Sequence, residues 1–432
     1  MADLSVNFAG IKSPNPFWLA SAPPTDKEYN VVRALKAGWG GVVWKTLGED
    51  PPVVNVSSRY GAVSYGGNRI MGFNNIELIT DRPLDVNLRE IKSVKRDFPD
   101  RAIVVSLMVP CEENAWKAIL PLVEETGADG IELNFGCPHG MSERGMGAAV
   151  GQVPEYVEMV TRWCKQNTRM PVIVKLTPNV TDILAPARAA HSGGADAVSL
   201  INTIMSIVSV DLDLMAPTPV VGGLGTHGGY CGPGVKPIAL RMVGEIARQA
   251  DMRGLPISGI GGISTWSDAA EFMALGSGTV QICTAAMLHG FRIIDDLTDG
   301  LSNWMDQKGY SRIKDFQGKA VPNFVHWEDL DINFKTLARI DQDLCIQCGL
   351  CHIACEDTAH QAISAARVDG RRHYEVIDEE CVGCNLCSHV CPVDNCITMN
   401  PAETGLPFST WKEHPNNPLR VDSPSSQTKA LA

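Results

Sequence analysis

The sequence predicts a (β/α)8 barrel of the TIM type with a small cysteine-rich domain behind it. Over the first 310 residues, eight short apolar runs alternate with eight amphipathic stretches. This alternation is typical of a parallel barrel, with a doubly wound sheet as the alternative. Glycines close the amphipathic stretches in "ALKAGWGGV", "ETGADGI", "SGGADAV" and "ALGSGTV", which indicates helices that end just before a strand. Nine of the 14 cysteines fall between residues 345 and 396 and mark the second domain.

The apolar runs are five to seven residues long and rich in β-branched side chains, as buried parallel strands are. We expect strands at 17–21, 41–46, 102–108, 131–135, 172–176, 197–202, 256–262 and 279–284. We expect helices at 26–37, 87–98, 113–126, 154–167, 181–192, 235–249, 266–275 and 285–306. Residues 51–75, rich in Gly, Ser and Asn, predict an extra hairpin beside the active site. The expected domains are a barrel at 1–310, a linker at 311–338, the cysteine-rich domain at 339–400 and a tail at 401–432.

Composition excludes several classes of protein. The 432 residues carry a net charge of -12, which argues against nucleic acid as a partner because phosphate binding needs a basic patch. No apolar run approaches the ~18 residues of a membrane helix, and "MADLSVNFAG" lacks the basic and apolar parts of a secretory signal. We therefore expect a cytoplasmic protein without membrane contact, whose cysteines are metal ligands or catalytic thiols rather than disulfides.

The cysteine-rich domain contains the motif C-x2-C-x2-C-x3-C twice, as "CIQCGLCHIAC" and "CVGCNLCSHVCP". Three thiolates spaced two residues apart can hold three corners of an iron–sulfur cube, and the fourth, on a helical turn, reaches the other cluster. We therefore predict a ferredoxin-like domain with two [4Fe–4S] clusters. The ligands are Cys345, Cys348, Cys351 and Cys391 for one cluster, and Cys381, Cys384, Cys387 and Cys355 for the other. Paired zinc sites are the alternative, but zinc favours two pairs of ligands separated by a longer loop. Cys396 lies outside both motifs, and we expect it to be a buried or unligated thiol.

Polar residues stand where the expected barrel strands end, which is where the active sites of such barrels lie. They are Ser21, Lys45, Thr46, Asn134, Lys175, Asn202 and Thr203. The last two strands end in "GIGG" and "CT", where glycines let backbone N–H groups approach an anion. The combination predicts a phosphate-bearing cofactor. "GLGTHG" at 223–228 fits a dinucleotide motif, but no helix opens directly after it, so we expect a loop there and no nicotinamide site in this chain.

One thiol is out of place for a core residue. In "ELNFGCPHGMSERGMG" (132–147), Cys137 follows an apolar run and precedes a glycine-rich loop that carries His139 and Glu143. A structural cysteine would lie inside the apolar run, whereas a cysteine just after the run, at the open end of the barrel, can face a ligand. We therefore interpret Cys137 as a reactive thiol.

The chain resembles the dihydropyrimidine dehydrogenases, in particular the flavin and iron–sulfur subunit of the bacterial two-subunit type, over residues 1–400. The resemblance rests on "NPFWLASAPP", "GWGGVVWKT", "NNIEL", "ELNFGCPHGMSERGMG", "KLTPNVTDI", "INT", "GGYCGPGVKPIALR" and "GIGGI", together with the paired cysteine motifs. It implies FMN in the barrel and reversible reduction of uracil or thymine to the 5,6-dihydro form. Hydride from FMN would add at C6, and Cys137 would be the general acid that protonates C5. A thiol of pKa ~8.5 can give and retake that proton near neutral pH.

The resemblance also implies the remaining site residues. The implied substrate contacts are Asn75, Asn134, Asn202 and Thr203, and amides suit the imide edge of the ring because each offers a donor and an acceptor. The implied FMN contacts are Ser21, Lys45, Thr46, Asn134, Lys175, Gly232, Gly261, Gly262, Cys283 and Thr284. In one departure from the single-chain relatives, Gly136 stands where they have Ser.

The single-chain relatives carry FAD and NADPH sites in an N-terminal half that is absent from this sequence. The resemblance therefore implies a separate reductase subunit with FAD and NAD(P), whose electrons pass through the clusters. Two other functions stay open. The barrel alone would also resemble a dihydroorotate dehydrogenase-like flavoenzyme. A non-catalytic iron–sulfur electron-transfer subunit is the other alternative, and it would leave Cys137 and the asparagines unexplained.

Overall fold

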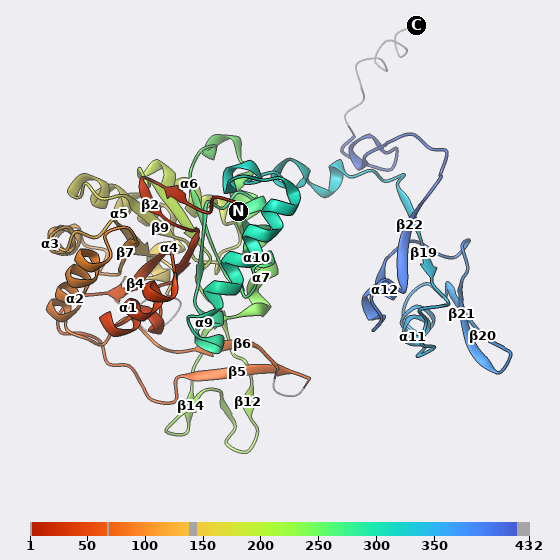
Figure 1. Cartoon of the computed structure of the whole chain (residues 1–432), viewed down its shortest axis with the longest axis horizontal. Coiled ribbons are helices and arrows are strands. Elements are labelled where there is room, and N and C mark those ends of the chain that lie inside the picture. Colours follow the sequence, from red (N-terminus) through yellow and green to blue (C-terminus); the bar gives the residue numbers. More distant parts are fainter. Residues whose placement is uncertain (1, 67–68, 138–144, 421–432) are drawn as a thin grey trace, which may run out of the picture. The chain divides into compact units, whose positions relative to one another are not determined.

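The computed structural model describes residues 2–66, 69–137 and 145–420 (Figure 1). The chain divides into two compact units, Met1–Phe324 and Val325–Ala432. This division falls inside the expected linker 311–338, because Ile313 and Phe316 are buried in the core of the first unit. The barrel unit is therefore longer than the 310 residues that the strand pattern alone marks out.

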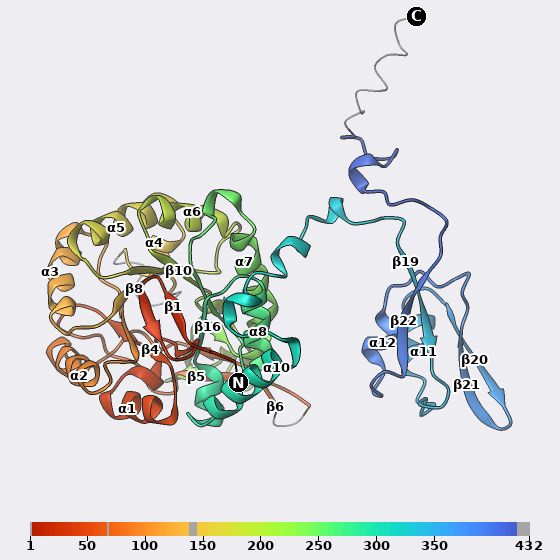
Figure 2. The same cartoon turned by 45° about the horizontal axis from the view of Figure 1, so that its top comes forward.

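Eight parallel strands close into a barrel in the first unit, and helices surround it (Figure 2). In spatial order the strands are β3 (Phe17–Leu19), β4 (Gly41–Leu47), β7 (Ala102–Leu107), β8 (Gly130–Asn134), β9 (Val172–Lys175), β10 (Ala197–Leu200), β17 (Ile257–Ile260) and β18 (Thr279–Ile282). β18 pairs with β3 and closes the ring. The predicted (β/α)8 fold is confirmed, and the doubly wound sheet is excluded.

The outer helices follow the strands as predicted, with one exception. They are α1 (Glu28–Ala37), α2 (Leu84–Asp97), α3 (Glu113–Glu124), α5 (Pro154–Asn167), α6 (Leu184–Ser192), α7 (Lys236–Ala247), α8 (Trp266–Ala274) and α10 (Ile293–Lys308). The expectation of a single helix over 285–306 is wrong. A short α9 (Thr284–His289) comes first and ends at Gly290, whose φ of 80° does not continue a right-handed helix.

The barrel interior is filled by polar side chains as well as apolar ones. Ser199 Oγ on β10 donates to Glu132 Oε2 on β8 at 2.8 Å, and Gln281 Nε2 on β18 donates to the same oxygen at 2.9 Å. These bonds join strands that are not neighbours in the barrel wall, so the three side chains meet inside it. All three side chains are almost completely buried, and this network partly satisfies the carboxylate.

A separate antiparallel sheet lies beside the barrel, in the order β11 (Ile204–Ser206), β16 (Gly228–Cys231), β6 (Arg69–Asn75) and β5 (Tyr60–Tyr65). Figure 1 shows β5 and β6 running alongside the barrel, next to the hairpins that carry β12 (Val210–Asp211) and β14 (Val220–Val221). Within the range 51–75, where a hairpin was expected, the strands are β5 and β6, and the first of them begins at Tyr60. "GLGTHG" contains β15 (Leu224–Gly225), which pairs with β14, and it opens no helix.

The second unit is built from two antiparallel strand pairs and two short helices. β19 (Lys335–Ile340) pairs with β22 (Ile397–Ala402), and β20 (Ile363–Val368) pairs with β21 (Arg371–Val376). The helices are α11 (Leu350–Glu356) and α12 (Leu386–Val390). The described part of the tail folds back on the start of this unit, where Ile332 N donates to Ser409 O at 2.9 Å. None of the helices in the described ranges has the length and hydrophobicity of a membrane span.

Candidate active site and cysteine cavities

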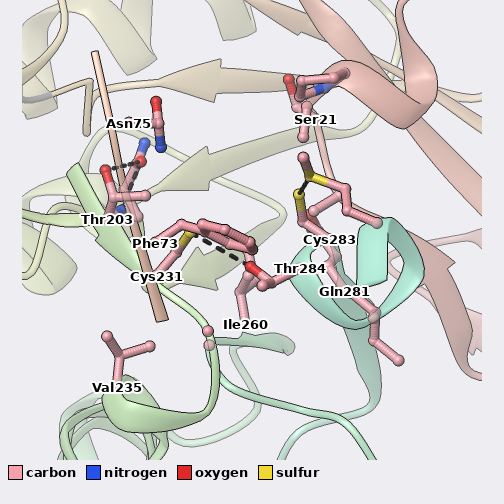
Figure 3. A pocket seen from close by; sticks show the side chains of 18 of the residues that line it. Ser21, Phe73, Asn75, Thr203, Cys231, Val235, Ile260, Gln281, Cys283 and Thr284 are labelled. Carbon is pink, nitrogen blue, oxygen red and sulfur yellow. Dashed lines mark hydrogen bonds between the residues drawn. The ribbon is translucent and has the colours of Figure 1, made fainter. Parts of the chain in front are cut away.

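One cavity opens where the barrel strands end, and it encloses about 1210 Å³ including its open mouth. Figure 3 shows side chains from the sheet, such as Phe73 and Asn75, and from the strand ends, such as Ser21 and Cys283, around the same hollow. The fourteen residues predicted to contact the substrate or FMN, with Cys137 among them, all line this cavity: Ser21, Lys45, Thr46, Asn75, Asn134, Cys137, Lys175, Asn202, Thr203, Gly232, Gly261, Gly262, Cys283 and Thr284.

A chain of hydrogen bonds connects the polar residues on one side of the cavity. Ser21 Oγ lies 3.1 Å from Thr46 Oγ1, which accepts from Asn134 Nδ2 at 3.0 Å. Asn134 Oδ1 in turn accepts from Asn202 Nδ2 at 3.0 Å, and Asn202 Oδ1 accepts from the backbone N of Thr203 at 2.8 Å. Each amide is thus held in one orientation by its neighbours, which prepares the site to recognise donors and acceptors on a flat ring.

Both lysines of the cavity lie beside carboxylates. Lys45 Nζ lies 2.6 Å from Glu77 Oε1, and Lys175 Nζ lies 3.5 Å from Glu132 Oε1. All four side chains are less than a tenth exposed. Buried lysines need such partners to remain charged. The pairs therefore keep two ammonium groups in place at the cavity wall while leaving little excess charge there.

The sequence reasoning missed Tyr60, Phe73 and Glu77, which reach the cavity from the sheet or directly after it. Glu77 accepts from Arg59 Nη1 at 3.2 Å and from the Tyr60 hydroxyl. Burial, together with the bond to Glu77, raises the pKa of Tyr60 far above its usual value, so this hydroxyl stays protonated. Glu77 is the fourth residue of "NNIEL", so the motif that identified Asn75 could also have indicated it.

Three described thiols line the cavity, in different surroundings. Burial raises the pKa of Cys283 far above its usual range and also raises that of Cys231. Cys231 Sγ accepts from Thr284 Oγ1 at 3.3 Å (Figure 3). Cys137 is half-buried and follows β8, and its carbonyl accepts from Ala148 N at 3.0 Å. His139 and Glu143, on the loop behind it, lie outside the described residues.

Two glycines allow close approaches at the cavity. A Cβ on Gly136 would lie 2.4 Å from Asn202 Cβ, so this backbone leaves no room for the serine of the single-chain relatives unless Asn202 moves. Gly262 has a φ of 75°, and a Cβ there would lie 2.8 Å from the backbone N of Lys236. The absence of side chains at Gly261 and Gly262 leaves backbone that an anionic group can approach.

Two further cavities lie in the second unit, and each is lined by four of the predicted cluster ligands. The first cysteine cavity contains Cys345, Cys348, Cys351 and Cys391, and the second contains Cys355, Cys381, Cys384 and Cys387. In both, the fourth cysteine of one motif joins the first three of the other, which is the exchange that the spacing predicts. No group of three or more His, Cys, Asp or Glu side chains in the described ranges could hold a single metal ion. The four cysteines of each cavity instead surround a space between them, and they fit one iron–sulfur cube in each cavity.

Comparison with known proteins identifies both parts of the chain. The family model "Dihydroorotate dehydrogenase" matches residues 3–305, and the model "4Fe-4S dicluster domain" matches residues 338–399. The NAD-dependent dihydropyrimidine dehydrogenase subunit PreA of Escherichia coli (strain K12) is 41% identical over 96% of this chain and 98% of its own length. The chain belongs to the dihydropyrimidine dehydrogenase family.

Other relatives place this family member among related oxidoreductases. The chloroplastic dihydropyrimidine dehydrogenase (NADP(+)) of Arabidopsis thaliana is 42% identical over 76% of this chain and 79% of its own length. The catalytic subunit of dihydroorotate dehydrogenase B (NAD(+)) of Pyrococcus abyssi is 40% identical over 74% of this chain and 99% of its own length. A ligand-free structure of DHODH from Eimeria tenella covers 74% of this chain and 92% of its own, with a TM-score of 0.62 and 20% identity, and shows the shared barrel fold.

Proposed function

We propose that this chain is the catalytic subunit of a dihydropyrimidine dehydrogenase that reversibly reduces uracil or thymine to the 5,6-dihydro form, linked to NAD(P). The observation that carries this proposal is the common cavity. Cys137, the asparagines and the predicted flavin contacts come from the ends of nine different strands, seven in the barrel and two in the antiparallel sheet, yet they line one space. A non-catalytic electron-transfer subunit would not need a preorganised amide set beside a thiol.

FMN fits the glycine-rich end of this cavity. Gly232, Gly261 and Gly262 all have positive φ values, and they leave backbone without side chains where a phosphate can accept N–H groups. Lys45 and Lys175 supply positive charge along the wall. When bound, FMN supplies the hydride for C6 of the ring and receives it back in the reverse reaction.

Cys137 provides the proton that completes the reduction. Addition of hydride at C6 leaves negative charge developing at C5 and its neighbouring carbonyl, and a donor beside C5 removes that charge. The thiol gives its proton to C5 in reduction and takes it back from C5 in oxidation. The hydrogen bond from Gly136 N to Asn134 Oδ1, 3.2 Å long, holds the backbone just before this cysteine. This bond ties the proton donor to the residue that would orient the substrate.

The charge balance of the cavity favours a neutral ring over the carboxylate-bearing dihydroorotate. Both lysines among the described lining residues lie beside Glu77 or Glu132, and no arginine is found among those residues. A substrate carboxylate buried here would need a cation of its own. Dihydroorotate oxidation remains the second candidate, because the matched barrel family carries that name.

We further propose that two [4Fe–4S] clusters, held in the two cysteine cavities, relay electrons from a reductase subunit that binds FAD and NAD(P). The match to a subunit of an NAD-dependent enzyme supports a separate partner of this kind. The test is co-expression of this chain with its candidate reductase, followed by flavin, iron and sulfide analysis and a uracil assay with NADH and NADPH. Uracil-dependent oxidation by the complex, with FMN in this chain, supports the proposal. A flavin-free chain, or a complex inactive on uracil and thymine, contradicts it.

A further inference from the structure

The second unit is internally repeated, and its two halves share a set of matching backbone hydrogen bonds. Asp341 N donates to Cys396 O at 2.8 Å, and Ile377 N donates to Ala362 O at 2.8 Å. Asp341 directly follows β19 in the first half, and Ile377 directly follows β21 in the second half. Each carbonyl accepts from the first cysteine of its motif: Cys345 N donates to Asp341 O and Cys381 N donates to Ile377 O, each at 3.0 Å. Cys396 therefore occupies the position that Ala362 occupies in the other half.

This pair is where the two cavities differ. Cys396 lines the first cysteine cavity, and Ala362 lines the second. Both residues are 2% exposed, and each directly precedes a strand, β22 or β20. The first cavity is thus lined by five thiols, although a cube needs four ligands.

The fifth thiol points toward the ligands of the first cavity. Its side chain lines the same cavity as the thiols of Cys391 and Cys345. Its contact with the carbonyl of Asp341 is long, at 3.7 Å, and that carbonyl already accepts from Cys345 N. The S–H group is therefore weakly engaged by the backbone and close to two ligand sulfurs.

We propose that Cys396 is a positioning residue for the first cluster, a thiol that donates a hydrogen bond to a ligand sulfur and raises the reduction potential of that cluster. Reduction adds an electron to a group that is already rich in negative charge. A donor to a ligand sulfur stabilises the reduced state more than the oxidised state, and hydrogen bonds to sulfur are among the factors that set cluster potentials. The Ala362 side chain offers no such donor, although the backbone N of Ala362 donates to Cys355 Sγ at 3.3 Å in the second cavity. This inference rests on the proposed presence of two clusters.

The experiment uses the full chain, loaded anaerobically and titrated electrochemically while the reduced clusters are followed by EPR. Cys396→Ala should retain all iron and lower one midpoint potential while leaving the other in place. Cys396→Ser, which keeps a donor, should recover part of that shift. Ala362→Cys should raise the potential that Cys396→Ala leaves unchanged. Cys164→Ala, which removes a buried thiol from α5 in the barrel unit, is the matched control and should move neither.

The outcomes separate this inference from the proposed function. If the parent chain lacks two clusters, the premise in the proposed function fails. If the parent has both clusters and Cys396→Ala leaves both potentials unchanged, Cys396 does not tune the first cluster. If Cys396→Ala instead loses about four irons, one cube, Cys396 is a ligand, and the assignment of Cys391 to that cavity is also wrong.

Discussion

Replacement of Asn134 by leucine should impair substrate turnover without emptying the flavin site. Asn134 makes three side-chain hydrogen bonds, to Thr46 Oγ1, Asn202 Nδ2 and Gly136 N, at 3.0, 3.0 and 3.2 Å. The last two hold the neighbouring amide and the backbone that precedes Cys137. At ~0.5–1.5 kcal/mol for each bond, losing these two costs about 1–3 kcal/mol. The expected fall in kcat/KM is therefore ~5–150-fold.

The control is Asn134→Asp, which keeps an acceptor for both of these donors and loses only the donated bond to Thr46. Its kcat/KM for dihydrouracil should fall less than that of Asn134→Leu. The assay is steady-state oxidation of dihydrouracil with a dye acceptor, normalised to bound FMN. Leucine activity within twofold of the parent, or an aspartate variant that is more impaired than the leucine variant, would refute the reasoning.

Four further outcomes are expected. Cys137→Ala should still bind FMN and the clusters, but its rate of ring reduction should fall ~10²–10⁴-fold, the usual contribution of general acid catalysis. Cys137→Ser should retain a little activity, with a shifted pH optimum. Uracil turnover by Cys137→Ala within a few-fold of the parent would show that the thiol is not the acid. The purified chain should contain about eight irons, two cubes of four, and zinc in their place would overturn the ligand assignment. The chain alone should not oxidise NADH or NADPH, because no dinucleotide motif stands at a strand-to-helix turn, and robust turnover would reveal a missed site. Burial alone would raise the pKa of Asp268, but hydrogen bonds from Lys236 and from the backbone of Ser264 and Thr265 outweigh it, so the pKa in the folded protein is lowered. The charged carboxylate therefore stabilises the fold at neutral pH. The loss of stability in Asp268→Asn should be constant there and shrink only below pH ~4, near the pKa of the unfolded chain. A stability difference that grows with acidity would contradict this sign.

Local sequence patterns predicted the barrel well because they report local events. Gly38, Gly127, Gly194 and Gly276, which close the four quoted helix ends, all have positive φ values between 77° and 119°. Such glycines end helices wherever the rest of the chain goes. Gly290 also ends a helix, α9, but it lies within the amphipathic stretch 285–306. The helical periodicity of that stretch continues past Gly290, so the sequence predicted one helix where the structure has two.

The parts of the site that the sequence did not predict depend on contacts across the chain. The ion pair of Lys45 with Glu77 joins residues 32 positions apart, and Asn75 Nδ2 donates to Gly229 O, which lies 154 positions later. β11 and β16 are only three and four residues long, too short for an alternating pattern to identify them. The cysteine exchange was predictable because its spacing is fixed by the size of the cluster, whereas the contact of Cys396 with the first cavity appeared only in the folded unit.

The most direct measurement of the central claim is anaerobic mixing of this chain alone with dihydrouracil or with dihydroorotate, followed by the absorbance of its flavin. The cavity that holds the asparagines and Cys137 should allow dihydrouracil to bleach the flavin within the mixing experiment, while dihydroorotate leaves it oxidised. Bleaching by dihydroorotate and not by dihydrouracil would make the chain a dihydroorotate dehydrogenase. A flavin that responds to neither would contradict a catalytic role for this cavity.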